Sequence, residues 1–135
     1  MKKLIIIFLL LMPILAKAEW KFITRSVDQE SPLGGEYSVD FSSILNNGGY
    51  SRVWVLLNYY ATQISKVNNQ SYASSKMYWE VDCSNRKLRF LSITYFSKKN
   101  AYGSVIETYT YNPPSDWIYI GPGDNSSIIA KYVCH

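Results

Sequence analysis

Two carboxylates, Glu80 and Asp82, lie two positions apart in a segment with the composition of a strand. Side chains two positions apart on a strand point to the same face of the sheet. Pairs of carboxylates carry out the acid–base chemistry of most glycoside hydrolases. Carboxylates placed in this way more often form a solvated strand edge, and no other group in the sequence completes a hydrolytic site. We therefore expect a protein that is not an enzyme, with a small hydrolase as the last alternative.

The sequence offers no set of residues suited to a metal or a cofactor. Its single histidine, His135, is the last residue, so no following segment holds the imidazole in place. Zinc sites need several cysteine, histidine or acidic ligands together. Gly121-Pro122-Gly123 precedes a predicted helix but lacks the lysine and the longer glycine pattern of a phosphate-binding loop. We expect no cofactor and no metal, and we interpret residues 121–123 as a turn.

The N-terminus has the three parts of a secretory signal. Met1 is followed by two lysines, an apolar run over residues 4–15 and then Ala16-Lys17-Ala18. This pattern predicts a signal peptide at residues 1–18, cleaved after Ala18, and one mature domain at residues 19–135. The apolar run is shorter than the about twenty residues of a membrane span, so we expect no stable membrane insertion after cleavage. An uncleaved N-terminal anchor is the alternative.

Export determines how the two cysteines, Cys83 and Cys134, are interpreted. Exported proteins fold in an oxidising compartment, where two thiols most simply form one disulfide. The chain-entropy estimate for a loop of this length is about 4 kcal/mol of stabilisation. Two free thiols, or a bridge between two chains, are the alternatives.

The positive charge of the chain belongs largely to the predicted signal. The whole chain has a formal net charge of +4, but Lys2, Lys3 and Lys17 would leave with the signal. The mature chain then keeps 11 Lys and Arg against 10 Asp and Glu, a net charge of +1. This balance gives no support for binding to nucleic acid or to a membrane surface. We expect a protein partner and no nucleic acid.

Runs of aromatic and β-branched residues, separated by Asn, Ser, Gly and Pro, predict a series of short strands. The expected strands are residues 20–27, 36–40, 52–60, 77–83, 88–96 and 103–109, with a loop at 66–75 and a short apolar segment at 117–120. Strict alternation in the strand 88–96 places Leu88, Phe90 and Ser92 on one face and Arg89, Leu91, Ile93 and Tyr95 on the other.

Two helical segments are expected. Asp40 or Ser42 caps a single helical turn that runs through Ile44 and Leu45. Asp124 or Ser126 caps a last helix whose buried face contains Ile128, Ile129, Tyr132 and Val133. The fold class is therefore α+β, a mainly antiparallel β-sheet with a C-terminal helix packed against it and one disulfide.

The basic side chains of the mature chain concentrate at the two ends of the strand 88–96. Tyrosine and arginine are enriched at contact hot spots, and tyrosines, including Tyr109 and Tyr111, occur in and after this strand. The candidate partner-binding residues are Arg86, Lys87, Arg89, Lys98, Lys99, Tyr95 and Tyr102. The alternative is an ordinary sheet surface whose edge lysines block aggregation.

An ordered set of short segments extends over nearly the whole mature chain. Its members are Val53-Trp54-Val55-Leu56-Leu57-Asn58-Tyr59, Glu80-Val81-Asp82-Cys83, Arg89-Phe90-Leu91 to Tyr95, Gly103, Trp117-Ile118, Gly121-Pro122-Gly123 and Val133-Cys134. Together with both cysteines, this set resembles the surface-adhesin protein E family of small exported bacterial proteins. The resemblance implies an antiparallel sheet and a C-terminal helix closed by the disulfide.

The resemblance also implies binding to host extracellular-matrix and serum proteins, and a possible homodimer. The adhesin that names the family binds through a basic stretch before the first cysteine, and the matching residues 69–76 contain one lysine here. That adhesin is lipid-anchored, whereas this chain has no cysteine near the predicted cleavage site. We therefore expect an exported binding protein that is periplasmic, cell-surface-associated or secreted. The alternative is a periplasmic partner or inhibitor protein that binds a bacterial envelope component.

Overall fold

A computed structural model describes residues 18–27 and 34–134 of the chain. The strands are β1 (Trp20–Arg25), β2 (Gly35–Asp40), β3 (Leu45–Asn47), β4 (Tyr50–Ile64), β5 (Ser71–Asp82), β6 (Lys87–Phe96), β7 (Val105–Thr110) and β8 (Ile118–Tyr119). The helical segments are the 3-10 turns η1 (Phe41–Ser43) and η2 (Lys99–Ala101), and the α-helix α1 (Asn125–Val133). The predicted signal peptide and His135 lie outside the described residues.

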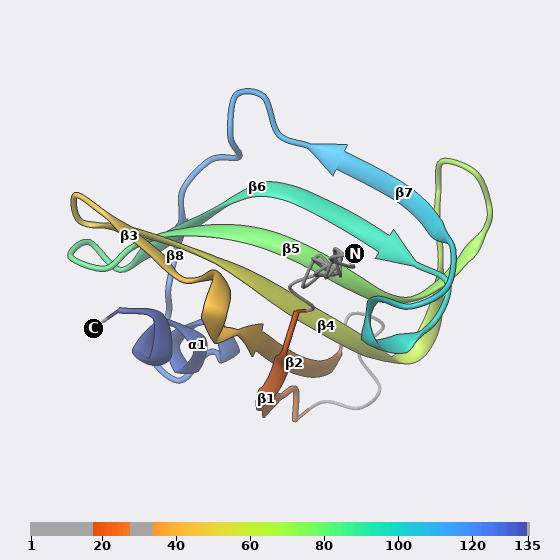
Figure 1. Ribbon diagram of the computed structural model, residues 1–135, viewed down its shortest axis with the longest axis horizontal. Helices are drawn as coiled ribbons and strands as arrows, with labels where there is room; N and C mark the ends of the chain where they lie inside the picture. The colour runs from red at the N-terminus through yellow and green to blue at the C-terminus, as the bar shows by residue number, and fades with distance from the viewer. Residues whose placement is uncertain (1–17, 28–33, 135) are drawn as a thin grey trace, which may run out of the picture.

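The strands form one antiparallel sheet in the order β1-β2-β4-β5-β6-β7, with β3 paired to β4 and β8 paired to β6. Helix α1 lies near the edge of the sheet formed by β1 and β2, and β7 forms the other edge (Figure 1). Helix α1 packs against β1 and β4. The predicted fold class, a mainly antiparallel sheet with a C-terminal helix, is confirmed.

Alternation along the long central strand β4 gives the sheet two different faces. Val53, Val55 and Leu57 are buried on the face that packs against α1, which we call the helix face. Their partners on β5 are Trp79, Met77 and Ser75. Ile129 and Val133 from α1 complete this core. The intervening residues of β4, including Arg52 and Trp54, lie on the other face, which we call the opposite face.

The predicted loop at residues 66–75 is wrong in its second half, because β5 already begins at Ser71. The polar residues Ser74 and Ser75 are fully buried in this strand. The Ser74 hydroxyl donates to the Lys98 carbonyl at 2.6 Å, and the Ser75 hydroxyl lies 3.1 Å from the Tyr59 hydroxyl. Buried polar groups with hydrogen-bond partners are compatible with a central strand, so polarity alone misled the prediction.

The predicted helical turn after Asp40 is shorter than expected. The Asp40 carboxylate accepts the backbone N–H of Ser42 at 3.1 Å, so the predicted cap is confirmed, but the turn ends at Ser43. Leu45 does not belong to it. Residues 45–47 instead form β3, which pairs with the start of β4 around Gly48 and Gly49 at φ of +58° and +96°.

The predicted alternation in β6 is wrong beyond Phe90, because the strand contains a β-bulge. Phe90 is paired with Trp79 and Ser92 with Tyr78, which leaves Leu91 as the extra residue. The bulge moves Ile93 and Tyr95 to the helix face and Ser92 to the opposite face. Strict alternation cannot reveal an inserted residue.

The burial of α1 also differs from the predicted pattern, at two positions. Ile129 and Val133 are fully buried, as predicted, whereas Ile128 is only partly buried and Tyr132 is exposed. The Tyr132 ring meets the Phe41 ring edge-on at 5.9 Å, so it covers η1 rather than entering the core. The helix therefore presents a narrow apolar stripe, one residue wide on each turn.

The disulfide joins Cys83, which follows β5, to Cys134, which follows α1, with a Cα–Cα distance of 5.7 Å. It closes a loop with a sequence separation of 51 and ties the end of α1 to the end of β5. The predicted pairing is confirmed.

We predict that replacing both cysteines, Cys83→Ala with Cys134→Ala, lowers the free energy of unfolding by about 4 kcal/mol, because the unfolded chain regains the entropy of the open loop. Urea unfolding followed by tryptophan fluorescence measures the change. The oxidised and reduced wild-type protein serves as the matched pair. A loss below about 1 kcal/mol in both comparisons would contradict the prediction.

Candidate functional site

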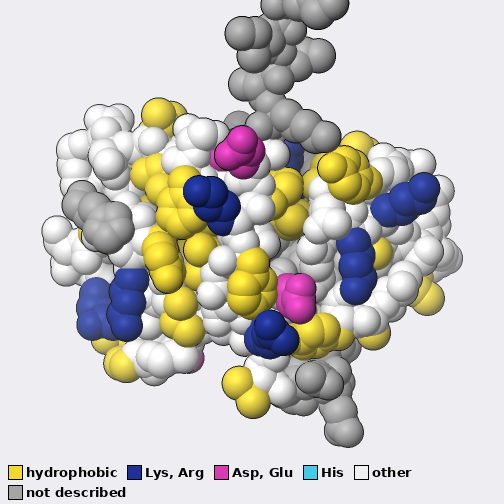
Figure 2. Space-filling model, turned by 60° about the horizontal axis from the view of Figure 1, so that its bottom comes forward, with side chains coloured by type: hydrophobic (Ala, Val, Ile, Leu, Met, Phe, Trp, Pro, Cys, Tyr) yellow, Lys and Arg dark blue, Asp and Glu magenta, His cyan; other side chains and the backbone are white. Residues whose placement is uncertain are grey.

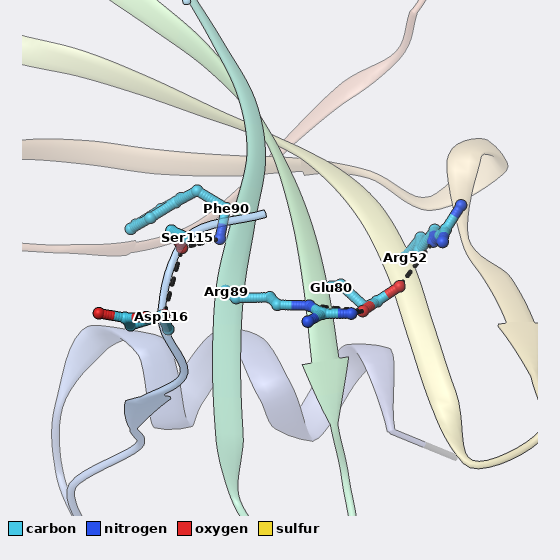
Figure 3. Close-up of polar contacts among 6 residues, drawn as sticks. All are labelled: Arg52, Glu80, Arg89, Phe90, Ser115 and Asp116. Atoms are coloured by element: carbon cyan, nitrogen blue, oxygen red, sulfur yellow. Dashed lines mark hydrogen bonds and ion pairs between the residues drawn. The ribbon is translucent and has the colours of Figure 1, made fainter. Parts of the chain in front are cut away.

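A buried carboxylate between two arginines organises the opposite face of the sheet. Arg52 on β4, Glu80 on β5 and Arg89 on β6 occupy directly paired positions on three adjacent strands. The Arg52 Nε donates to Glu80 Oε2 at 2.8 Å, while the Arg89 Nε and Nη2 lie 2.8 and 2.6 Å from Glu80 Oε1. Figure 3 shows the three side chains in one row across the strands. Both carboxylate oxygens are therefore occupied by arginine.

The charge of Glu80 is held by its partners. Its side chain is 4% exposed, whereas those of Arg52 and Arg89 are 47% and 28% exposed. Burial raises the pKa of the Glu80 carboxyl, but the hydrogen bonds and charges of Arg52 and Arg89 outweigh burial, and the net pKa is lowered. Two cations face one anion, so the row presents a net positive charge to solvent.

Aromatic rings flank this row on both sides. The Arg89 guanidinium lies 4.2 Å from the centroid of the Trp117 ring, which stacks on Tyr50 at 5.8 Å. On the other side the Trp54 and Tyr78 rings stack at 4.5 Å. The Lys76 ammonium lies 4.6 Å from the Trp54 ring. We call this group the cation–aromatic cluster; its members are Tyr50, Arg52, Trp54, Lys76, Tyr78, Glu80, Arg89 and Trp117.

The segment after β7 brings Trp117 to the cluster. The Phe90 N–H donates to the Ser115 hydroxyl at 2.8 Å, and the Ser115 N–H donates to the Phe90 carbonyl at 3.1 Å (Figure 3). These bonds use the backbone groups next to the bulge of β6, where β7 no longer pairs. The segment continues as β8, which pairs with Lys87 and Leu88. At the bulge, the partner of β6 therefore changes from β7 to β8. Trp117, which directly precedes β8, lies beside Arg89.

The predicted basic residues do not form one patch. Arg89 belongs to the cation–aromatic cluster, whereas Arg86 and Lys87 are exposed at the start of β6 and Lys98 and Lys99 are exposed after its end. A ten-residue strand separates the two pairs by about 30 Å at about 3.3 Å per residue. On the face shown in Figure 2, Lys and Arg side chains lie at several separate places among hydrophobic ones and do not form one continuous patch.

The predicted tyrosines also separate. Tyr95 lies on the helix face, beyond the reach of α1, in a hollow that we call the tyrosine groove. The groove has a volume of about 700 Å³. It is lined by Tyr72, Ile93, Tyr95, Glu107, Tyr109 and Tyr111, with residues 63–67 as its rim. Tyr102 lies elsewhere, in a hollow with Trp20, Lys76 and Phe96.

The two carboxylates that could have suggested hydrolysis have different roles. Glu80 is buried and bound by two arginines, so the interpretation as a solvated edge is wrong for this residue. The Asp82 carboxylate accepts the side-chain N–H of Asn85 at 2.8 Å and thereby holds the turn between β5 and β6. Among residues 18–27 and 34–134, no three His, Cys, Asp or Glu side chains form a group that could hold a metal ion.

The predicted turn at residues 121–123 is present, and the carboxylate of the following residue lies beside it. The Asp124 carboxylate lies against Gly121, at the start of α1. Asp124, one of the two predicted caps, is the N-cap residue of α1, but its side chain makes no capping hydrogen bond.

The chain matches one known protein family. The model of the family described as surface-adhesin protein E matches residues 20–135. The chain belongs to the surface-adhesin protein E family. No curated protein sequence matches it. Solved structures provide the comparison with individual proteins.

Two crystal structures of Haemophilus influenzae protein E share the fold of this family member. One has a TM-score of 0.61 at 12% identity, covering 87% of this chain and 85% of the other. The second, crystal form II, has a TM-score of 0.58 at 14% identity, covering 73% and 79%. Identities this low establish the common fold alone. No helix in the described part of this adhesin-family chain is long and apolar enough to cross a membrane.

Sequence reasoning missed most of the cation–aromatic cluster. Arg52 and Glu80 are 28 positions apart, and only the strand register brings them together. One signal was available, since Glu80 lies between Trp79 and Val81, and Arg89 lies between Leu88 and Phe90. A charge inside such an apolar stretch calls for a partner of opposite charge.

We predict that Glu80→Gln lowers the free energy of unfolding by about 2 kcal/mol at pH 7, because the variant leaves both arginines without their anion. The folded-state pKa of Glu80 is lowered, so its stabilisation is present above the unfolded-state pKa and is lost as the pH falls through the folded-state pKa. The difference between wild type and variant should therefore shrink between about pH 5 and pH 2.

Urea unfolding over this pH range checks the prediction. Asp116→Asn is the matched control, because Asp116 is a nearby exposed carboxylate that makes no ion pair within the described structure (Figure 3). A constant difference between wild type and Glu80→Gln at all pH values would contradict a role for the charge.

Proposed function

We propose that this chain is an exported, non-enzymatic binding protein that attaches to a host extracellular-matrix or serum protein. The observation that carries the proposal is the cation–aromatic cluster on one rigid sheet face. Membership of the surface-adhesin protein E family supports an adhesin-like surface protein. The cluster supplies a surface suited to that role.

The composition of the cluster favours protein recognition. Tryptophan, tyrosine and arginine dominate binding hot spots, and the cluster contains two of each. Arg52 binds Glu80 through its Nε, and its side chain is 47% exposed, so a partner can reach the guanidinium. A guanidinium held by a buried carboxylate loses little freedom on binding. An acidic surface of the partner would complement the net positive charge of the row.

Export is part of the proposal. Residues 1–18 have the pattern of a secretory signal, and cleavage after Ala18 would leave one domain from residue 19 to residue 135. Mass spectrometry of the protein from its native host tests the cleavage site. Protease accessibility on intact cells separates a surface location from a periplasmic one, which would favour an envelope partner. Sedimentation analysis tests the homodimer that the resemblance implies.

We predict that Arg52→Ala weakens binding to the partner about tenfold, because truncation of a hot-spot arginine costs at least about 1–2 kcal/mol. The partner is selected by screening the folded domain against immobilised matrix and serum proteins in biolayer interferometry. Arg86→Ala is the matched control, since Arg86 is an exposed arginine outside the cluster.

Equal losses in Arg52→Ala and Arg86→Ala would place the binding surface elsewhere. Thermal unfolding of both variants verifies that they remain folded. Absence of binding to every matrix and serum protein, for a protein confined to the periplasm, would overturn the proposal.

A further inference from the structure

The tyrosine groove is a second surface, separate from the cation–aromatic cluster. It lies on the helix face of β5, β6 and β7, while the cluster lies on the opposite face. Its volume of about 700 Å³ falls within the range of small-ligand sites, about 300–1,000 Å³. The groove is therefore large enough for a ligand and plays no part in the proposed protein contact.

Four tyrosine rings make up much of the lining. The Tyr72 and Tyr95 rings have centroids 4.6 Å apart with planes tilted by 54°, and the Tyr109 and Tyr111 rings are also 4.6 Å apart, edge to face. The faces of aromatic rings carry negative electrostatic potential. The rings within each pair lie at different angles to one another.

A carboxylate that forms no ion pair with any described residue lies among these rings. Glu107 is paired with Tyr95 across β6 and β7 and precedes Tyr109 by two positions, so all three share one face. Its Oε2 accepts the Ser65 hydroxyl at 3.0 Å, and no described residue forms an ion pair with it. The charge of Glu107 contributes, after burial, to raised pKa values of Tyr72 and Tyr95. Lys66 on the rim is the one cationic side chain in the described lining, and it forms no ion pair with Glu107, so no direct contact neutralises the carboxylate among the rings.

The rim of the groove is held in place by hydrogen bonds. The Ser65 contact ties residues 63–67 to Glu107, and the Asn68 side-chain N–H donates to the Ile106 carbonyl at 2.9 Å. Both bonds join the rim to β7. The shape of the groove thus depends on fixed contacts and does not require closure around a ligand.

We propose that the tyrosine groove binds a quaternary ammonium group, such as the trimethylammonium of a choline head group, against the tyrosine rings and the Glu107 carboxylate. Quaternary ammonium ligands are recognised by aromatic side chains through cation–π attraction. The negative carboxylate adds the charge complementarity that a neutral apolar ligand would not use.

A primary ammonium fits the groove less well. Its three N–H donors need three acceptors around one nitrogen once they leave water, whereas the free oxygen of Glu107 and the tyrosine hydroxyls belong to separate side chains on three strands. A trimethylammonium group has no N–H donors and presents methyl groups to the rings and to Ile93. Its desolvation therefore leaves no hydrogen bond unmade.

Titration of the folded domain with choline chloride tests the proposal, with calorimetry for affinity and backbone NMR shifts for location. The neutral isostere 3,3-dimethylbutan-1-ol has the same shape without the charge, and ethanolamine has the charge without the methyl groups. We expect choline to bind about tenfold more tightly than either compound, with shifts on β6 and β7. Equal affinities for choline and its neutral isostere would overturn the proposal, as would shifts confined to other strands.

Two variants and one control connect binding to the groove. Glu107→Gln removes the charge and keeps the shape, and Tyr109→Leu removes one ring at a position that is 53% exposed. We expect each variant to weaken choline binding about fivefold while the domain remains folded. Tyr119→Leu, at a 62% exposed position on β8, should bind as the wild type does. Unchanged affinity in both groove variants would contradict the assignment.

Free choline and a membrane-bound choline head group share the same ammonium chemistry. Cosedimentation with phosphatidylcholine vesicles, compared with phosphatidylglycerol vesicles, separates the two sources. Pelleting with phosphatidylcholine alone, lost in Glu107→Gln, identifies the head group of a membrane. Choline binding in solution without pelleting identifies a soluble ligand, and pelleting with phosphatidylglycerol alone would contradict the charge preference.

Discussion

The width of the sheet relative to its single α-helix is the constraint on which the other features depend. A helix of nine residues is about 14 Å long and about 10 Å wide. Six strands at about 4.8 Å spacing form a layer about 24 Å wide. Helix α1 therefore covers only the half near β1 and β4, where Val53 and Val55 meet Ile129. The remaining half of the helix face and the whole opposite face must be completed by other side chains.

Tyrosine and buried serine complete the part of the helix face that α1 does not reach. A tyrosine ring contributes apolar area, and its hydroxyl can remain in contact with water at the edge of the core. The Tyr59 hydroxyl meets Ser75 inside the sheet, whereas Tyr109 is largely exposed. Phenylalanine at these positions would leave an exposed apolar surface that favours aggregation. The groove thus forms where α1 does not cover the helix face, and tyrosines and Glu107 make up much of its lining.

Charged side chains, rather than a second layer of helices or strands, cover this part of the opposite face. Arg52 and Arg89 lie over Glu80, and their stems and guanidinium planes cover it together with Trp117. A buried ion pair contributes little net stability because the desolvation of both partners offsets their attraction. Its value here is specificity of register, since a shift of one residue would place Glu80 in the apolar core of the helix face.

The strands were predictable where apolar periodicity and turn residues agree, as in β4 and in the turn between β5 and β6. The errors have identifiable physical causes. Ser74 and Ser75 are polar yet buried, because their hydroxyls have partners that only the tertiary structure supplies. The bulge at Leu91 lies next to Phe90, whose N–H is bonded by Ser115, 25 positions later. Local sequence carries no information about such partners.

The candidate site was less predictable than the fold for a related reason. A count of basic residues found Arg86 and Lys98, which are exposed and far apart, and gave no weight to Arg52. The residues that form the cluster come from β4, β5, β6 and the segment after β7, so their proximity is a property of strand order. Only Arg89 belongs both to the predicted set and to the observed cluster.

The position of the disulfide connects stability to both surfaces. The loop between Cys83 and Cys134 contains β6, β7 and β8, and therefore Arg89, Trp117, Tyr95 and Glu107. Closing this loop restricts the unfolded chain in the segment that supplies much of both surfaces. Because these strands are also fixed by Ser115 and by the rim contacts of Ser65, little ordering remains to be done when a partner binds. A small domain with one short helix can in this way present two rigid surfaces without enlarging its core.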